Sequence, residues 1–190
     1  MKKEETEPTL KDDLSTLIKL RLNTFVLITT FFGFLLGWKT NGAQFSLSAF
    51  WDLFHTLLGT ACAAFGSAVF NQVMEVESDA RMARTSNRPL PAKRILPSYA
   101  FALGWTLCAI GIIHLGAKIS FEAALLAAIT IGTYVFIYTP MKRVTSANTL
   151  VGAIPGAIPP MMGWVGAGHS LSHPAHHRRD RTRDRPDKCI

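Results

Sequence analysis

The chain has 190 residues, of which 48% are hydrophobic and 17% are charged, and its formal net charge is +7. Soluble globular domains carry about 25% charged residues, so this composition excludes an ordinary soluble domain and a disordered chain. The basic residues fall in short segments between apolar runs, as in the loops of membrane proteins, so we expect a lipid bilayer and no nucleic acid as partner.

The first 19 residues are polar and lack the apolar core of a secretory signal, which predicts a cytoplasmic N-terminal lead. Five stretches follow that are apolar enough to cross a hydrocarbon core about 30 Å thick, which needs roughly 20 residues each. The expected fold class is therefore all-α, a polytopic transmembrane helix bundle. We predict its helices at about Leu20–Trp38, Leu47–Met74, Pro97–Ala117, Phe121–Thr139 and Ala147–Gly168.

Lysine and arginine alternate in number from one inter-helix segment to the next. Five occur up to and including Arg21, five in 75–96 and two in 140–146, whereas the two intervening loops carry only Lys39 and Lys118. Membrane proteins keep their Lys/Arg-rich loops in the cytoplasm. We therefore expect a multi-pass protein of the inner (cytoplasmic) membrane with a cytoplasmic N-terminus.

The composition changes abruptly after Gly168. Residues 169–190 contain six Lys/Arg and no hydrophobic pattern, and the alternation of sides would put them outside the cell. Two explanations stay open: a genuine disordered tail, or a shift of the reading frame near residue 168. The sequence thus predicts a polar lead over 1–19, a transmembrane domain over 20–168 and a basic, disordered or out-of-frame tail over 169–190.

The main candidate site lies at the predicted cytoplasmic end of the second helix. Asn71, Glu75 and Asp79 are spaced i, i+4, i+8, so a helix carries them along one face. Their oxygens are the hard ligands that Mg²⁺ prefers, and Mg²⁺ usually completes its shell with water and substrate phosphates. The alternative is a solvated helix end whose acids are in register by chance.

Cations follow these acids in the next loop, at Arg81, Arg84, Arg88, Lys93 and Arg94. Guanidinium groups match phosphate geometry, so acids for a metal beside cations for an anion indicate a Mg²⁺–diphosphate site. Positive-inside topology alone would account for the number of these cations. A later loop adds Lys142 and Arg143 on the same predicted side, and its alternative interpretation is a plain helix–loop–helix corner.

Two strings carry a resemblance to a known family: NQVMEVESDARMARTSNRPLP from Asn71, and YTPMKRVTSANTLVGAIPGAIPPMMGW from Tyr138. In this order they resemble the UbiA-type membrane prenyltransferases, and within them the protoheme IX farnesyltransferases (haem O synthases). The resemblance covers roughly residues 14–168. It implies a bundle of nine transmembrane helices, of which about five are present here, and a Mg²⁺-dependent site that opens to the cytoplasm.

The resemblance also implies a reaction, the transfer of the farnesyl group of farnesyl diphosphate to a vinyl group of protoheme IX (haem b), which gives haem O. On the matching positions, Asn71, Glu75 and Asp79 would be the catalytic set that holds Mg²⁺ and diphosphate. Further contacts to the diphosphate would come from Arg84, Arg88, Lys142 and Arg143.

The chain departs from the family pattern in two places. Glu75 stands where the family has Asp, which keeps the carboxylate but extends it by one methylene. The family's second acidic motif, expected after the sixth helix, has no counterpart, so we expect a truncated or frameshifted member with impaired or no activity. Two alternatives stay open: a non-catalytic fragment or assembly partner of an oxidase, and a UbiA-type enzyme with a different aromatic acceptor.

Overall fold

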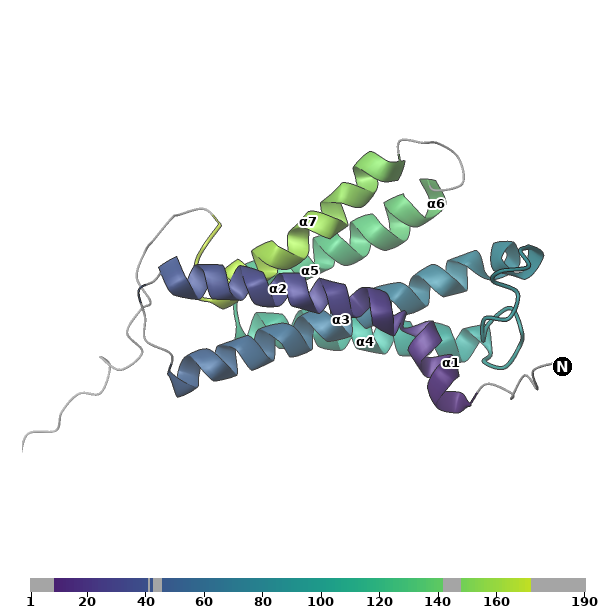
Figure 1. Ribbon diagram of the computed structural model, residues 1–190, viewed down its shortest axis with the longest axis horizontal. Helices are drawn as coiled ribbons and strands as arrows, with labels where there is room; N and C mark the ends of the chain where they lie inside the picture. Colours follow the sequence, from purple (N-terminus) through teal and green to yellow (C-terminus); the bar gives the residue numbers. More distant parts are fainter. Residues whose placement is uncertain (1–8, 41, 43–45, 142–147, 172–190) are drawn as a thin grey trace, which may run out of the picture.

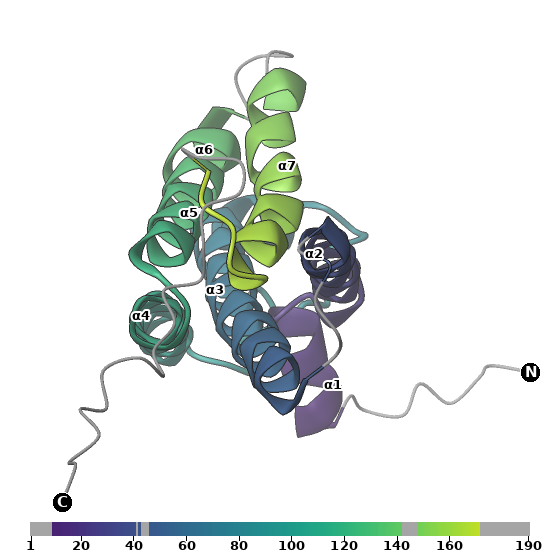
Figure 2. The same ribbon diagram turned by 90° about the vertical axis from the view of Figure 1, so that its left-hand side faces the viewer.

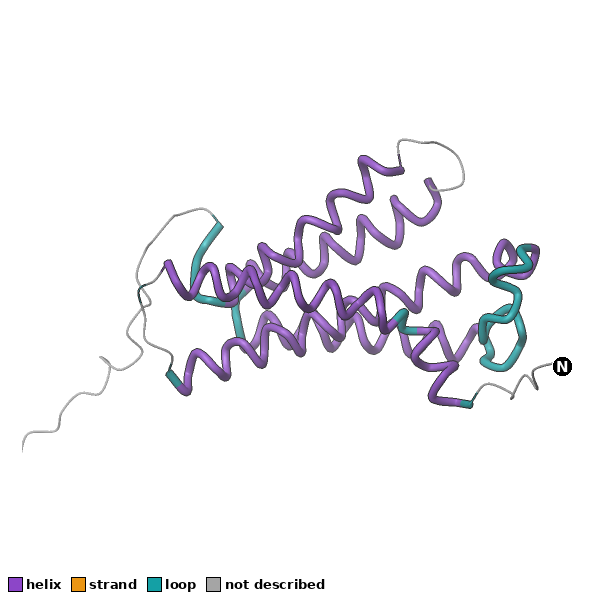
Figure 3. The backbone as a smooth tube through the Cα atoms, viewed as in Figure 1, coloured by secondary structure: helices purple, strands orange, loops and turns teal. Residues whose placement is uncertain are grey.

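The computed structural model describes residues 9–40, 42, 46–141 and 148–171, and all regular structure within these ranges is helical (Figure 3). The predicted all-α class is thus confirmed. The elements are α1 Leu10–Leu17, α2 Leu20–Thr40, α3 Leu47–Arg81, α4 Pro97–Lys118, α5 Phe121–Gly132, the π-helical η1 Thr133–Tyr138, α6 Thr139–Met141 and α7 Asn148–Gly166.

Four of the described segments are long and apolar enough to cross a membrane: α2, α3, α4 and the continuous stretch Phe121–Met141 that α5, η1 and α6 form together. The predicted helix starts agree closely with those observed. The main difference is α3, which continues seven residues beyond the predicted end at Met74. Its 35 residues span about 52 Å, far more than a hydrocarbon core of about 30 Å. One end of α3 therefore reaches beyond the apolar layer.

α3 lies at the centre of the bundle, with α4 on one side, α2 on the other, and the α5–α7 pair above it (Figure 2). The most extensive contacts join α3 to α4 and α2 to α7. α2, α3, α4, the Phe121–Met141 stretch and α7 alternate in direction, so α1, the 82–96 loop, the C-terminal end of α6 and the start of α7 gather at one end (Figure 1). That end is the one to which the sequence assigned the Lys/Arg-rich segments.

Small residues let the helices of both pairs approach closely. A Cβ built on Gly163 of α7 would lie 2.0 Å from the backbone oxygen of Thr30 in α2, and one on Gly33 would lie 2.0 Å from the Pro160 oxygen. Between α3 and α4, a Cβ on Gly111 would come within 2.7 Å of the Ala63 nitrogen. Such backbone contact is typical of membrane bundles, where small residues replace hydrophobic burial as the basis of association.

The short helix α1 is fixed against the end of α3 by three kinds of contact. Its buried Asp13 receives Arg94 of the 82–96 loop through both carboxylate oxygens, at 2.8–3.1 Å. Gln72 of α3 donates to the carbonyls of Thr16 and Leu17 in the last turn of α1, at 2.6 and 3.1 Å. The Leu17 side chain is only 1% exposed. The polar lead therefore ends in an element that belongs to the bundle.

At the opposite end, the described chain continues three residues beyond the predicted boundary at Gly168. The ring of His169 is buried, stacks on Trp164, and contacts the Gly37 carbonyl through Nε2 at 2.8 Å. Glu122, in the first turn of α5, accepts hydrogen bonds from the Ser170 hydroxyl and the Leu171 amide. The first residues of the predicted tail thus pack on the bundle, and 172–190 lie outside the described residues.

Candidate functional site

The three residues that the spacing singles out lie on the buried face of α3 near its C-terminal end. The exposed fractions of Asn71, Glu75 and Asp79 are 1%, 5% and 5%, whereas Glu77 on the same turns is exposed. We refer to Asn71, Glu75 and Asp79 as the α3 stripe. A solvated helix end would leave these side chains in water, so their burial points to a role inside the bundle.

Asn71 joins three parts of the chain. Its Oδ1 accepts a hydrogen bond from the Nζ of Lys19, which lies between α1 and α2. Its Nδ2 donates to the hydroxyl of Thr139 at 3.1 Å, and that hydroxyl donates in turn to the Tyr134 carbonyl at 2.8 Å. Neither Lys19 nor Thr139 was among the residues predicted from the sequence, because no local pattern marks a partner more than 50 positions away.

Asp79, at the other end of the stripe, is held by the loop that follows α3. Arg88 Nη1 lies 2.5 Å from Asp79 Oδ2, with the carboxylate side chain 7% and the guanidinium side chain 28% exposed. Thr85 donates its hydroxyl to the Asp79 carbonyl at 2.9 Å, which fixes the turn that brings the loop back. The sequence predicted acids beside cations, and this pair is one direct instance.

The remaining predicted cations are less closely tied to the stripe. Arg84 is exposed on the same loop as Arg88. Arg94 contacts Asp13 and the Asn87 carbonyl, so it fixes α1 to the loop. Lys142 and Arg143 lie outside the described residues, and their predicted contacts with diphosphate stay predictions.

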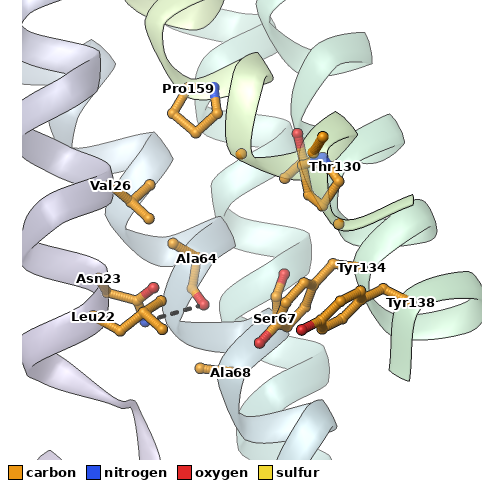
Figure 4. Close-up of a pocket in the computed structure, with 14 residues that line it drawn as sticks. Leu22, Asn23, Val26, Ala64, Ser67, Ala68, Thr130, Tyr134, Tyr138 and Pro159 are labelled. Atoms are coloured by element: carbon orange, nitrogen blue, oxygen red, sulfur yellow. Dashed lines mark hydrogen bonds between the residues drawn. The ribbon is translucent and has the colours of Figure 1, made fainter. Parts of the chain in front are cut away.

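A cavity of about 510 Å³ adjoins the stripe, and Figure 4 shows ten labelled residues of its lining. Ser67 of α3 lines it one helical turn before Asn71, and Tyr134 and Tyr138 of η1 lie beside Ser67 and form one wall. Asn23 lies across from them on α2, and donates to the Ala64 carbonyl at 3.3 Å. The walls are mostly apolar, with a few polar groups near the stripe, which is the usual make-up of a small-molecule site.

The aromatic wall of the cavity depends on the π-helical turn. The rings of Tyr134 and Tyr138 stack with centroids 5.4 Å apart and planes inclined by 16°. A Cβ on Gly152 of α7 would lie 2.9 Å from the Tyr138 ring, so the glycine leaves room for it. The Tyr134 carbonyl accepts the Thr139 hydroxyl, to which Asn71 of the stripe donates. π-helical turns occur frequently at functional sites, and this one connects the cavity wall to the α3 stripe.

The side-chain oxygens of the α3 stripe are of the kind that bind magnesium. An amide oxygen and two carboxylates are hard oxygen ligands, and Mg²⁺ usually completes its shell with water and substrate phosphates. Within the described ranges, no group of three or more His, Cys, Asp or Glu side chains lies close enough to hold a metal. The residues therefore fit a metal that diphosphate oxygens help to hold, and do not form an all-protein cage.

Comparison with known proteins gives a consistent assignment. The sequence model of the UbiA prenyltransferase family matches residues 25–177. A protoheme IX farnesyltransferase of Solibacter usitatus is 38% identical over 166 residues, 84% of this chain and 56% of the relative. One from Anaeromyxobacter dehalogenans is 41% identical over 80% of this chain and 50% of the relative.

A relative from a mitochondrion shows the same similarity. The mitochondrial protoheme IX farnesyltransferase of Arabidopsis thaliana is 38% identical over 83% of this chain and 35% of its own length. The chain spans about half the length of the curated bacterial relatives that it matches. No solved structure matches it. The family predicted from the two sequence strings is thus confirmed.

Proposed function

The chain belongs to the UbiA prenyltransferase family, and we propose that it transfers the farnesyl group of farnesyl diphosphate to protoheme IX (haem b) to give haem O. Its apolar helices and its family make it a multi-pass membrane protein. We further propose that it lies in the inner membrane with the N-terminus in the cytoplasm, because the Lys/Arg-rich segments share one end of the bundle.

The observation that carries the proposal is a buried polar stripe beside a largely apolar cavity. Asn71, Glu75 and Asp79 offer oxygens to a metal–diphosphate head group, and the 510 Å³ cavity begins one helical turn away at Ser67. A prenyl diphosphate is likewise divided into a polar and an apolar part, because its charged diphosphate head group is joined to an apolar chain. The names of the relatives support farnesyl as the chain and protoheme IX as the acceptor.

The reaction begins with breakage of the bond between the allylic carbon and the diphosphate oxygen, whose electron pair leaves with the diphosphate. Bound Mg²⁺ would supply electrostatic stabilisation of this leaving group. By the resemblance, Arg84, Arg88, Lys142 and Arg143 would share that task, since preorganised cations cost no reorganisation as charge develops.

The apolar part of the cavity would then protect the farnesyl cation from water until the haem vinyl group is in place. The π electrons of the vinyl group form the new carbon–carbon bond. A water molecule adds to the resulting cation on the porphyrin side and releases a proton, which leaves the hydroxyethylfarnesyl product.

The test is haem O formation by this chain in proteoliposomes supplied with farnesyl diphosphate, haem b and MgCl₂, followed by chromatography and mass spectrometry. We expect Glu75→Gln and Asp79→Asn each to lower the rate by roughly a hundredfold or more, and EDTA to abolish it. The control is Glu77→Gln, which removes an exposed acid two residues from Glu75 and should change little.

Two results would contradict the proposal. Absence of haem O from the wild-type chain would mean that this chain does not carry out the proposed reaction, in line with the impaired or absent activity predicted from the sequence, and would favour a non-catalytic role such as assembly of an oxidase. If Glu75→Gln and Asp79→Asn form haem O at the wild-type rate, the proposed reaction stands, but the α3 stripe is not part of its site. Prenylation of a quinone-type ring in place of haem would point to a different aromatic acceptor.

A further inference from the structure

A cation that the sequence did not single out reaches the α3 stripe from the N-terminal side. Lys19 lies between α1 and α2, and its Nζ donates a hydrogen bond to Asn71 Oδ1 on α3. Its side chain is half-buried, and its ammonium group contacts the stripe at Asn71. We propose that Lys19 is a further diphosphate-binding residue, an assignment that rests on the proposed function.

The backbone at Lys19 is unusual for a lysine. Its φ is +48°, in the left-handed region, and its amide closes the end of α1 by donating to the Thr16 carbonyl at 3.2 Å. Helices commonly end on such a residue, and Gly or Asn is usual there because other side chains pay a steric penalty of about 1 kcal/mol. Lys19 therefore lowers the stability of this helix end relative to glycine, and a function of its side chain would explain why lysine is found here.

The neighbouring contacts hold the ammonium group in position. α1 is anchored through the ion pair of Asp13 with Arg94 and through the two hydrogen bonds from Gln72. On the far side, the Lys19 carbonyl accepts the amides of Leu22 and Asn23 and so begins α2. Because both flanking helices are fixed, the side chain needs little further ordering to meet a ligand at Asn71.

Lys19 and Arg88 bracket the stripe. Arg88 contacts Asp79 at the outer end, while Lys19 contacts Asn71 at the end that adjoins the cavity. A head group held along the stripe, with its isoprenoid chain in the cavity, would meet Arg88 with its distal phosphate and Lys19 with its proximal one. A compact ammonium with three donors suits a phosphate oxygen in that position.

The test measures binding of inorganic diphosphate with MgCl₂ to the whole chain in nanodiscs by calorimetry, alongside the melting temperature. Lys19→Gly removes the ammonium group but suits the left-handed backbone. We expect it to raise Kd by roughly ten- to a hundredfold, the loss of a charge-assisted contact, with the melting temperature unchanged or higher. The control is Lys11→Ala on the exposed face of α1, which removes the same charge and should leave Kd unchanged.

Lys19→Gly with wild-type affinity for diphosphate would overturn the inference, since it would make Lys19 a structural tie alone. If Lys19→Gly lowers the melting temperature, the affinity of Lys19→Arg for diphosphate decides the question. An affinity near that of the wild type supports a cation role for residue 19. A loss of affinity as large as that of Lys19→Gly overturns the inference. Failure of the wild-type chain to bind magnesium diphosphate is a different result, because it removes the proposed function and this inference with it.

Discussion

Asp79 and Arg88 show at the scale of single residues how the site depends on a loop. The carboxylate is almost fully buried, and the guanidinium group that meets it comes from nine positions later in the chain. A buried charge without a partner is costly, whereas the pair itself adds little net stability because both groups lose water on burial. The loop that follows α3 must therefore fold correctly before the end of the stripe can be stable.

This dependence predicts that Arg88→Met destabilises the chain by about 1–3 kcal/mol, because a largely buried carboxylate loses its charged partner. Arg84→Met, which removes an exposed arginine from the same loop, should stay within about 0.5 kcal/mol of the wild type. Thermal unfolding in one detergent, followed by circular dichroism, compares the two variants. Equal effects would mean that the Asp79–Arg88 pair contributes nothing specific.

At this scale the sequence predicted some partners and not others. The spacing of Asn71, Glu75 and Asp79 was enough to predict a shared face, because a helix has a fixed period. The contact of Lys19 with Asn71 depends on how α1 packs, which no local pattern contains. The polar Asn23 within an apolar run was a visible sign of an interior contact, but nothing in the sequence showed that it would line the cavity and donate to the Ala64 carbonyl.

At the scale of helices, α7 combines three prolines with glycines whose roles differ. Pro155, Pro159 and Pro160 lie inside the helix, where each removes a backbone donor. Gly163 touches the backbone of α2, whereas a Cβ on Gly156 would meet nothing within 4 Å. Gly163 therefore permits close packing of α7 on α2, whereas Gly156 lines the 510 Å³ cavity and has room for a Cβ.

The two glycines give a matched pair of variants. Gly163→Ala should destabilise the chain by about 1–3 kcal/mol or more, because its Cβ would overlap the Thr30 carbonyl and push α2 and α7 apart. Gly156→Ala should stabilise it by up to about 1 kcal/mol, because alanine favours helix and meets no obstacle. Melting temperatures of both variants in the same detergent check the prediction. It is wrong if Gly163→Ala is as stable as Gly156→Ala.

Helix boundaries were predictable where apolar runs end at charged or turn-forming residues, as at Leu20, Pro97 and Phe121. α3 was predicted too short because its last turns are polar, and a hydropathy pattern ends where lipid contact ends even if the helix continues. The π-helical turn at Thr133–Tyr138 was not predictable, since an extra residue in one turn does not interrupt an apolar run. It is nevertheless the turn that supplies the aromatic wall of the cavity.

For the molecule as a whole, the distribution of charge and the arrangement of helices agree. α1, the 82–96 loop, the C-terminal end of α6 and the start of α7 share the end of the bundle at which the α3 stripe lies (Figure 1). The segments up to Arg21 and from 75 to 96 carry five Lys/Arg each, and the loops at the opposite end carry Lys39 and Lys118. Charge counting therefore predicts that the site faces the cytoplasm.

This orientation can be tested with two matched cysteine variants in a background without Cys62, Cys108 and Cys189. Ala83→Cys lies in the loop beside the stripe and Ala117→Cys near the other end of α4, and both alanines are exposed. With the chain expressed in bacterial cells, a membrane-impermeant maleimide should label Ala117→Cys in spheroplasts and Ala83→Cys only in inverted vesicles. The reverse labelling pattern would put the α3 stripe outside the cell. That result would contradict the orientation predicted from the Lys/Arg counts and the proposed site for a cytoplasmic diphosphate substrate.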